Sequence, residues 1–339
     1  MSDEMHGLVV RKTTGSYTVQ TEAGVITCSI SNRLRKHLVY PMRDPSSLGY
    51  YKVVTVEDIK QVDPVAIGDQ VRLTDAGHGS GVISEILPRS SKLTRRAAGK
   101  KPLEQVIVAN ADQAVVVMSA AQPAPQWNLL DRYLASVEVS ELAALICLTK
   151  LDLVRGTDGE PEIAARAGEY AALGYTVLLT SAGSGEGIDA LREQLAGRLS
   201  VLIGKSGVGK TTLLNALQPG LGQRVGVVNA QINKGRHTTT HLEMFPLDSG
   251  GYIVDTPGMK QFGLWAIEPE DVALLYREIA PQVGRCKFKL DCTHRHEPGC
   301  EVRAAVTRGE ISQRRYESYL HLCKHLYAER VVVKEQITG

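Results

Sequence analysis

The stretch from Gly204 to Thr211 constrains the fold of this chain more than any other feature of its sequence. It reads Gly-Lys-Ser-Gly-Val-Gly-Lys-Thr and fits the phosphate-binding pattern G-x-x-x-x-G-K-[ST]. Glycines allow a tight turn whose backbone N–H groups point at an anion, between a strand and the N-terminus of a helix. Both flanks are present, because Val201 to Ile203 is an apolar run and Lys210 to Leu217 predicts a helix, stopped by Pro219. We therefore expect a nucleotide-binding α/β domain.

Each position of this loop has a predicted role. The residues expected to contact the nucleotide are Gly204, Lys205, Ser206, Gly207, Val208, Gly209, Lys210, Thr211 and Thr212. Lys210 reaches the β- and γ-phosphates in such loops, and the Thr211 hydroxyl ligates Mg²⁺. A chance match in a glycine-rich chain is the alternative, and the correct flanks argue against it.

The chain around this loop alternates between strands and helices. Apolar runs predict strands at Gln113–Met118, Ala143–Leu148 and Thr176–Leu179. Apolar residues at helical spacing predict helices that begin at Trp127, Pro161 and Ile188, the last of them reaching Leu199. Such alternation is typical of a parallel sheet with helices on both faces. The predicted fold class is an α/β P-loop domain, and 339 residues leave room for further domains.

Two short loops after these strands favour guanine as the base. Thr149-Lys150-Leu151-Asp152 is a variant of N-K-x-D, and it follows a strand where ligand-binding loops lie. The Asp152 carboxylate only accepts hydrogen bonds, so it matches the two N–H donors of guanine, and adenine offers no such pair. Thr149 replaces the usual Asn and loses an amide that braces the loop. Ser181 and Ala182 follow the next strand, and the backbone of such a loop commonly meets the guanine O6. The expected base-binding residues are Thr149, Lys150, Asp152, Ser181 and Ala182.

Two stretches after the phosphate loop fit nucleotide switches. Gly235 to Thr240 supplies hydroxyls for a Mg²⁺-ligating switch; Thr239 is the predicted ligand, with the threonines on either side as alternatives. The sequence Asp-Thr-Pro-Gly begins at Asp255, which would bind Mg²⁺ through water, and ends at Gly258, whose N–H would meet the γ-phosphate.

The residue that positions the attacking water is not obvious. Met259 follows Gly258 where many GTPases carry the Gln that orients this water, and a thioether cannot do so. His237 lies in the threonine-rich switch and is our candidate for a catalytic residue. A surface or RNA contact is the alternative role for this histidine.

The N-terminal part predicts a small β-barrel. Short β-prone runs occur at Leu8–Val10, Tyr17–Val19, Val25–Cys28, Gln70–Leu73 and Val82–Ile86. They fit an OB-fold, and an SH3-like barrel would look much the same. Basic residues at Arg33 to His37 precede tyrosines and suit an RNA-binding surface, although a solvated loop is an equal alternative. We expect an OB-fold-like RNA-binding barrel at 1–90 and a basic linker at 91–104.

Three of the six cysteines crowd together near the C-terminus. The acidic N-terminus lacks the apolar core of a signal peptide and no apolar run approaches a membrane span, so we expect a cytoplasmic protein without a membrane partner. There, crowded cysteines indicate a metal rather than disulfides. The predicted ligands form a closed set typical of structural Zn²⁺: Cys286, Cys292, His294 and Cys300. Unligated buried cysteines are the alternative. We expect the GTPase domain at 105–264 and a helical zinc-binding domain at 265–339.

The order of the motifs is unusual. GTPases ordinarily run from the phosphate loop through the switches to N-K-x-D and S-A, whereas here the two base loops come first: a circular permutation. With its barrel, its R-H-T-T-T and D-T-P-G motifs and its Cys/His region, the chain resembles the bacterial ribosome small subunit-dependent GTPase A family. That family's cluster is C-x4-C-x-H-x5-C, so the first gap here is one residue longer, and His296 is the reserve ligand if Cys286 does not bind.

The resemblance implies hydrolysis of GTP to GDP and phosphate, stimulated by the 30S subunit, in late small-subunit assembly. It implies binding to 16S rRNA, one structural Zn²⁺, and Mg²⁺ bound with GTP; we expect a monomer. A nucleotide-gated RNA-binding scaffold with incidental hydrolysis is the alternative. A P-loop ATPase is a third possibility, against which Asp152 argues.

Overall fold

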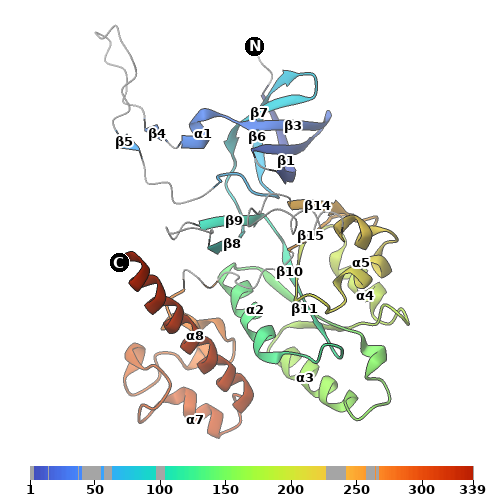
Figure 1. The fold of residues 1–339 in the computed structure, drawn as a ribbon. Coiled ribbons are helices and arrows are strands. Elements are labelled where there is room, and N and C mark those ends of the chain that lie inside the picture. The colour runs from blue at the N-terminus through green and yellow to red at the C-terminus, as the bar shows by residue number, and fades with distance from the viewer. Residues whose placement is uncertain are drawn as a thin grey trace. The chain divides into compact units, whose positions relative to one another are not determined.

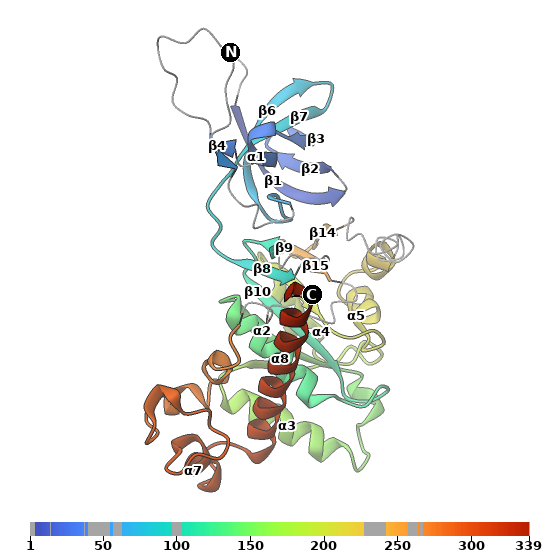
Figure 2. The same cartoon turned by 60° about the vertical axis from the view of Figure 1, so that its left-hand side comes forward.

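The chain forms two compact units. The computed structural model describes residues 4–13, 15–36, 38–39, 55–56, 63–96, 104–226, 242–256, 264 and 267–338. The first unit comprises Met1–Ala111 and Val227–Phe245, and the second comprises Asp112–Gly226 and Pro246–Gly339 (Figures 1 and 2). By their contacts, the described residues of the C-terminal region therefore belong to the same unit as the phosphate loop.

A closed five-stranded barrel forms the first unit's core. Its strands are β1 (Glu4–Thr13), β2 (Ser16–Thr21), β3 (Gly24–Ile30), β6 (Gln70–Gly77) and β7 (Ser80–Ile86). The order β1-β2-β3-β7-β6 closes back onto β1, and β3 runs parallel to β7. This arrangement is that of an OB-fold, as predicted. Gly7 is needed in β1, because a Cβ there would lie 2.4 Å from Val19 Cγ1.

Alternate side chains of these strands fill the barrel. The buried core consists of Val9, Tyr17, Val19, Ile26, Cys28, Val65, Val71, Leu73 and Ile83. The first unit also contains α1 (Asn32–Lys36), β4 (Leu38–Val39), β5 (Thr55–Val56) and β14 (Leu242–Pro246). The strand β14 pairs antiparallel with β1.

The predicted linker at 91–104 is partly a β-hairpin. Its residues Lys92–Arg96 form β8, which pairs antiparallel with β9 (Glu104–Ala109). The reason is that β9 supplies main-chain partners and that Leu93, opposite Val108, is fully buried. The strand was not predicted because Lys92–Arg96 is mostly basic and its buried residue Leu93 is its one apolar residue.

A parallel sheet forms the centre of the second unit. Its strands lie in the order β12 (Thr176–Leu179), β11 (Ala143–Thr149), β10 (Gln113–Ser119), β13 (Leu199–Ile203) and β15 (Tyr252–Asp255). All four pairings are parallel, and β10 and β13 are buried along their whole lengths. Helices cover both faces of such a sheet, which explains these apolar runs.

The direction of each crossover decides which face a helix covers. The helices are α2 (Trp127–Val139), α3 (Glu160–Ala172), α4 (Ile188–Leu195) and α5 (Lys210–Leu217), with a short turn η1 (Leu151–Leu153). Right-handed crossovers place α2 and α3 on one face and α4 and α5 on the other (Figure 1). The prediction that the third helix reaches Leu199 is wrong: Gly197, with φ +70°, ends that turn, and Leu199 begins β13.

The C-terminal region packs on the α2 face. It contains the short turns η3 (Asp271–Leu275), η4 (Ala280–Gln282) and η5 (Lys289–Asp291), then α7 (Glu301–Thr307) and α8 (Gln313–Thr338). Its apolar core includes Val272, Tyr276, Ile311, Tyr319 and Leu326, and it extends to Ala135 on α2. The helix α8 thus rests on α2 (Figure 2).

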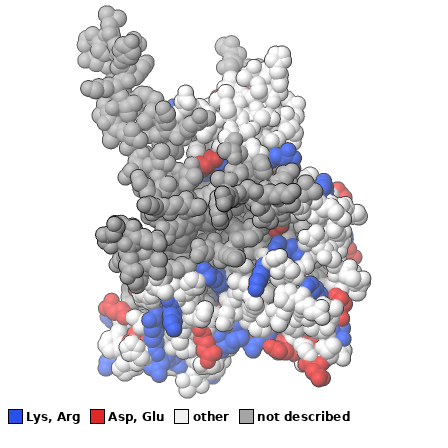
Figure 3. All heavy atoms as spheres, in the orientation of Figure 1, with Lys and Arg blue, Asp and Glu red and all other residues white. Residues whose placement is uncertain are grey.

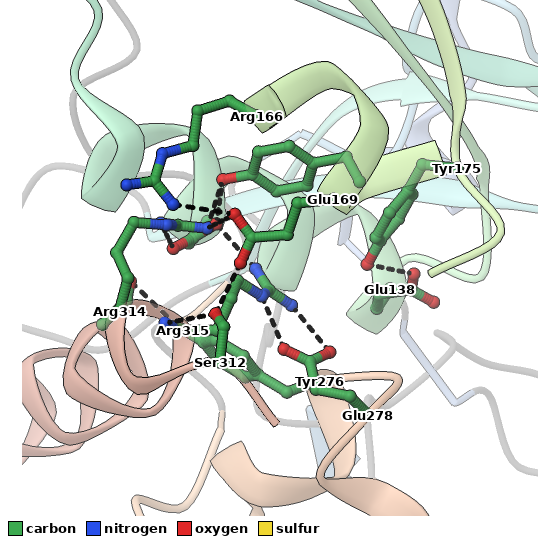
Figure 4. A network of polar contacts seen from close by, with 12 residues as sticks. Glu138, Arg166, Glu169, Tyr175, Tyr276, Glu278, Ser312, Arg314 and Arg315 are labelled. Atoms are coloured by element: carbon green, nitrogen blue, oxygen red, sulfur yellow. Dashed lines mark hydrogen bonds and ion pairs between the residues drawn. The ribbon is translucent and has the colours of Figure 1, made fainter. Parts of the chain in front are cut away.

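A buried network of charges joins α8 to α2 and α3 (Figure 4). Asp131 on α2 accepts hydrogen bonds from Arg315 Nη1 at 2.6 Å, Arg314 Nη1 at 2.9 Å and the Tyr170 hydroxyl at 2.5 Å. The second carboxylate partner of Arg315 is Glu278, with its two oxygens 2.6 Å from Nε and 3.0 Å from Nη2. Arg315 is 1% exposed, so its charge is compensated entirely inside the protein.

The outer surface of the described residues carries charges of both signs. Figure 3 shows basic and acidic atoms interspersed over the second unit on the face in view. In the part of the chain that the structure describes, no helix has the length and apolar character that crossing a membrane requires.

Candidate nucleotide site and metal centre

Five strands of the second unit end at the same edge of the sheet. Since all pairings are parallel, the loops that follow β10, β11, β12 and β13 meet there, together with Asp255 at the end of β15. The register aligns Ser119 with Thr149 at the ends of β10 and β11, and Leu202 with Asp255 at the ends of β13 and β15. Ligands bind at such an edge in open α/β sheets.

The loop after β13 has the backbone that the phosphate-binding pattern requires. Gly207 and Gly209 have φ values of +83° and +95°, which L side chains rarely adopt. A Cβ at Gly204 would lie 2.7 Å from the carbonyl oxygen of Val117 on β10, so the loop leaves the sheet in close contact with its neighbour. The loop then enters α5 at Lys210, the helix start that the sequence predicts.

Lys210 lies across this loop. Its ammonium donates to the carbonyl oxygens of Gly204 at 2.5 Å and Lys205 at 3.3 Å. Burial lowers the pKa of Lys210, and the negative charge of Asp255 opposes that shift. The carboxylate of Asp255 therefore favours the charged form of this ammonium beside the loop. Thr211 and Thr212 follow in the first turn of α5 and are exposed.

The loop after β11 is tied to the phosphate loop at two successive carbonyls. The Thr149 hydroxyl donates to Val208 O at 2.5 Å, and the Lys150 ammonium donates to Gly207 O at 2.8 Å and also to Gln122 O. Lys150 itself has a left-handed backbone, with φ +61°. The replacement of Asn by Thr149 predicts the loss of a side-chain hydrogen bond that braces this loop, whereas the Thr149 hydroxyl supplies such a bond.

Asp152 is oriented by the loop after β12. The Ser181 hydroxyl donates to Asp152 Oδ1 at 2.5 Å and accepts from the Ser184 N–H at 3.2 Å, and Ser181 is fully buried. Asp152 lines a cavity of about 260 Å³. The cavity is lined by Thr149, Lys150, Asp152, Leu153, Ala182, Gly183, Gly209, Thr212 and Leu213. It thus joins both predicted base loops to the phosphate loop.

The switch residues are described only in part. Asp255 ends β15 and is 8% exposed, and Thr256 donates to Leu202 O at 2.8 Å. His237, Thr238, Thr239, Thr240, Gly258 and Met259 lie outside the described residues. The predictions for those six residues therefore stay predictions.

A second cluster of functional side chains lies in the C-terminal region. The ligand atoms of Cys286, Cys292, His294 and Cys300 all lie within 4.8 Å of one another, and all four residues are buried. His294 Nδ1 is 3.5 Å from Cys286 Sγ and 3.6 Å from Cys300 Sγ. Cys286 is therefore part of the cluster despite the longer first gap, and the reserve ligand His296 is exposed.

The surroundings of this cluster suit a bound cation. Burial raises the pKa of the Cys292 thiol to about 12, so thiolates here require a positive charge beside them. Two tyrosines of α8 fix the loop that carries His294. Tyr316 donates to the carbonyl oxygen of His294 at 2.6 Å, and Tyr319 donates to that of Thr293 at 3.2 Å. Cys28, Cys147 and Cys323 are buried apart from the cluster, as predicted.

Comparisons with known proteins agree with this geometry. The model of a family described as RsgA GTPase matches residues 86–265. A small ribosomal subunit biogenesis GTPase RsgA from Gemmatimonas aurantiaca is 42% identical over 95% of this chain and 97% of its own length. This chain belongs to the RsgA GTPase family. Another RsgA, from Moorella thermoacetica, is 39% identical over 93% of the chain and 95% of its own length.

Solved structures extend the RsgA likeness to the whole fold. The crystal structure of YjeQ from Thermotoga maritima has a TM-score of 0.71 and 31% identity, covering 96% of this chain and 99% of that one. YloQ, described as a circularly permuted GTPase, has a TM-score of 0.68 and 29% identity, with 96% of each chain covered. The chain is thus a circularly permuted GTP hydrolase with an N-terminal barrel and a C-terminal Cys₃His cluster.

Sequence reasoning missed several residues in and beside the candidate nucleotide site. Gln122, whose carbonyl oxygen accepts from Lys150, was not singled out, although it lies three residues after the end of β10, where the carboxyl-end rule for parallel sheets places ligand loops. Leu153, Gly183 and Leu213 line the cavity beside predicted residues. Their apolar or featureless side chains carry no chemical signal of their own.

Proposed function

We propose that this chain hydrolyses GTP in response to the 30S ribosomal subunit and acts late in the assembly of that subunit. The observation that carries the proposal is the meeting of the phosphate loop, both base loops and Asp255 at one sheet edge, in permuted order. The relatives from Gemmatimonas and Moorella are small ribosomal subunit biogenesis GTPases, which supports the choice of the 30S subunit as partner.

Guanine recognition is assigned to the cavity between the base loops. The Asp152 carboxylate would accept hydrogen bonds from N1–H and N2–H of the base, and the Ser181 hydroxyl keeps that carboxylate in place. The Ala182 N–H would meet O6. The stem of Lys150 would lie over the base while its ammonium stays on Gly207 O.

The phosphates are assigned to the loop from Gly204 to Thr211 and the start of α5. Lys210 would exchange its contacts with loop carbonyls for the β- and γ-phosphates. Thr211, Thr239 and Asp255 would hold Mg²⁺, and Gly258 would donate its N–H to the γ-phosphate. Bound Mg²⁺ neutralises negative charge on the phosphate oxygens. Because Met259 cannot orient water, we assign that task to His237, with slow turnover expected in the absence of the subunit.

The remaining parts of the chain are assigned to RNA and zinc. We propose that the barrel at 1–90 and the basic segment at 91–104, which both precede the GTPase part at 105–264, bind 16S rRNA. Cys286, Cys292, His294 and Cys300 would hold one Zn²⁺ that stabilises the part at 265–339. The chain would act as a monomer in the cytoplasm.

The test is the steady-state rate of GTP hydrolysis with and without 30S subunits. We expect the 30S subunit to raise the rate by more than tenfold, and an equal concentration of 50S subunits to leave it unchanged. Equal stimulation by both subunits, or by neither, would contradict the ribosomal assignment. Equal affinity for ATP and GTP would contradict the guanine assignment.

A further inference from the structure

Thr149 has one hydrogen-bond donor in its side chain, and that donor has a partner. The hydroxyl lies 2.5 Å from Val208 O, and Thr149 is only 4% exposed. The nearest other acceptor that it meets is Met118 O, at 3.4 Å. A threonine hydroxyl carries a single proton, whereas an asparagine amide carries two. The short contact assigns the single proton of Thr149 to the phosphate loop.

This assignment matters because guanine presents two edges to a protein. The Watson–Crick edge offers the N–H donors that Asp152 matches, and the other edge offers the acceptors N7 and O6. Reading N7 requires a donor beside the base. The ammonium of Lys150 gives two of its three protons to Gly207 O and Gln122 O, and these two bonds hold it against the phosphate loop. Among the described residues that line the cavity, the other side-chain donor is Thr212, in the first turn of α5 at the phosphate end.

We propose that this chain reads guanine along its Watson–Crick edge and O6 only, and that it leaves N7 unread. Thr149 is then the specificity-determining residue, because its hydroxyl braces the phosphate loop and has no second proton for the base. The ligand class implied by this reading is guanine nucleotides without an acceptor at position 7, the 7-deazaguanine nucleotides. The inference rests on the proposed placement of guanine in the cavity at Asp152.

The test is competition of GTP and 7-deaza-GTP against a fluorescent GDP analogue on the full chain. The unaltered chain should bind the two nucleotides with equal affinity, within about twofold. In Thr149→Asn, one amide proton can keep the brace and the other can reach N7. That variant should prefer GTP over 7-deaza-GTP on the order of two- to tenfold, the range of one hydrogen bond.

Two matched variants separate the brace from base reading. Thr149→Ser keeps the hydroxyl with its single proton, so, whatever its absolute affinities, it should bind GTP and 7-deaza-GTP equally, within about twofold. Thr149→Val keeps the shape and removes the proton, so both nucleotides should bind more weakly by the same factor.

The outcomes distinguish this inference from the proposed function. If the unaltered chain binds 7-deaza-GTP at least fivefold more weakly than GTP, the inference is wrong, whether or not Thr149→Val abolishes the difference. If GTP still binds far better than ATP in that case, the guanine site itself stands. If ATP binds as well as GTP, the proposed guanine site fails instead. The first comparison uses the unaltered chain, so it does not depend on the folding of any variant.

Discussion

Asp152 owes its position to a neighbour on a different strand. The hydroxyl of Ser181, which follows β12, donates to its Oδ1 and in turn receives the N–H of Ser184. The carboxylate is therefore fixed before a base arrives, which lowers the entropy lost on binding. The proposed role of Asp152 in guanine recognition depends on its being an acceptor at both oxygens.

The substitution Asp152→Asn replaces one hydrogen-bond-accepting oxygen of the carboxylate with an NH₂ group, which donates. The amide would place a donor against a donor of guanine, so GTP affinity should fall by about 2 kcal/mol, roughly thirtyfold, as for a lost hydrogen bond to a charged group. Xanthosine triphosphate presents an acceptor there and should bind better than to the unaltered chain. Equilibrium titration with both nucleotides measures the effect. Asp158→Asn, an exposed carboxylate nearby, is the control and should change neither affinity.

At the scale of elements, the Cys₃His cluster and α8 depend on each other. Two tyrosine hydroxyls of α8 donate hydrogen bonds to the loop that carries His294. The helix α8 also packs in the same apolar core as Cys286 and Cys300. A metal that ties together the cluster's loops would therefore also order the surface on which α8 rests.

Cys300→Ser tests this dependence. Elemental analysis should find about one zinc per unaltered chain and much less in the variant, because a closed structural site needs all four ligands. Limited proteolysis should then cut the region after residue 265 first, while GTP binding persists. Cys323→Ser is the matched control, since Cys323 is equally buried but contacts Pro269 O and lies outside the ligand group. A chain that folds fully and resists protease without metal would contradict the zinc assignment.

The ion pairs of Asp131 with Arg314 and Arg315 fasten α8 to α2; both arginines are labelled in Figure 4. Asp131→Asn removes the charge that both Arg314 and Arg315 face, and it leaves two cations short of a partner in a buried place. Breaking such a pair costs about 3–5 kcal/mol, so the urea midpoint of the second unit should fall strongly.

Asp189→Asn provides the comparison for that prediction. Asp189 also pairs with an arginine, Arg192, but its side chain is 90% exposed. Exposed pairs contribute about 0–1 kcal/mol, so this variant should unfold almost as the unaltered chain does. A similar midpoint for both variants would show that the buried network adds little to the attachment of α8.

A helix or strand could be predicted where residues within it or beside it in the sequence determine its ends, and could not where its stability comes from residues distant in the sequence. The helix Lys210–Leu217 matches its prediction, because the phosphate loop fixes its start and Pro219 its end. The strand β8 was missed because its stability comes from pairing with β9, which no residue of β8 reveals. The ligands of the cluster were predictable from their spacing. The contact of Arg315 with Asp131, 184 residues away in sequence, was not, because burial of an arginine leaves no mark on its neighbours in the chain.

For the whole molecule, the permutation determines which part of the chain each switch leads into. The strand β15 ends at Asp255, and the chain continues from there into the C-terminal region. That region is also anchored on α2 by Arg314 and Arg315, within the same compact unit. A conformational change at the γ-phosphate would therefore reach a C-terminal region whose last helix, α8, is already attached to α2. The buried ion pairs of Arg314 and Arg315 with Asp131 oppose any large displacement of that helix.

The response of the molecule to the subunit depends on where its positive charge lies. The formal net charge is only +2, and described charges of both signs are interspersed on the face seen in Figure 3. The rRNA binding that we propose would therefore have to rely on local basic segments. The strand β8 carries two consecutive arginines, Arg95 and Arg96. Each phosphate contact by such a residue releases counterions. For about two contacts, the 30S concentration for half-maximal stimulation should rise roughly tenfold between about 50 and about 200 mM salt.

Replacing Arg95 and Arg96 together by Gln should raise that half-maximal concentration at low salt and flatten its dependence on salt, because those counterions are no longer released. GTP affinity in the free protein should stay the same, since neither arginine belongs to the phosphate loop or to the two base loops. The measurement is GTP hydrolysis against 30S concentration at both salt levels. Arg166→Gln with Arg192→Gln removes the same charge from α3 and α4 and is the matched control. If both double variants lose stimulation equally, the response reflects overall charge, and the basic segment is not the rRNA contact.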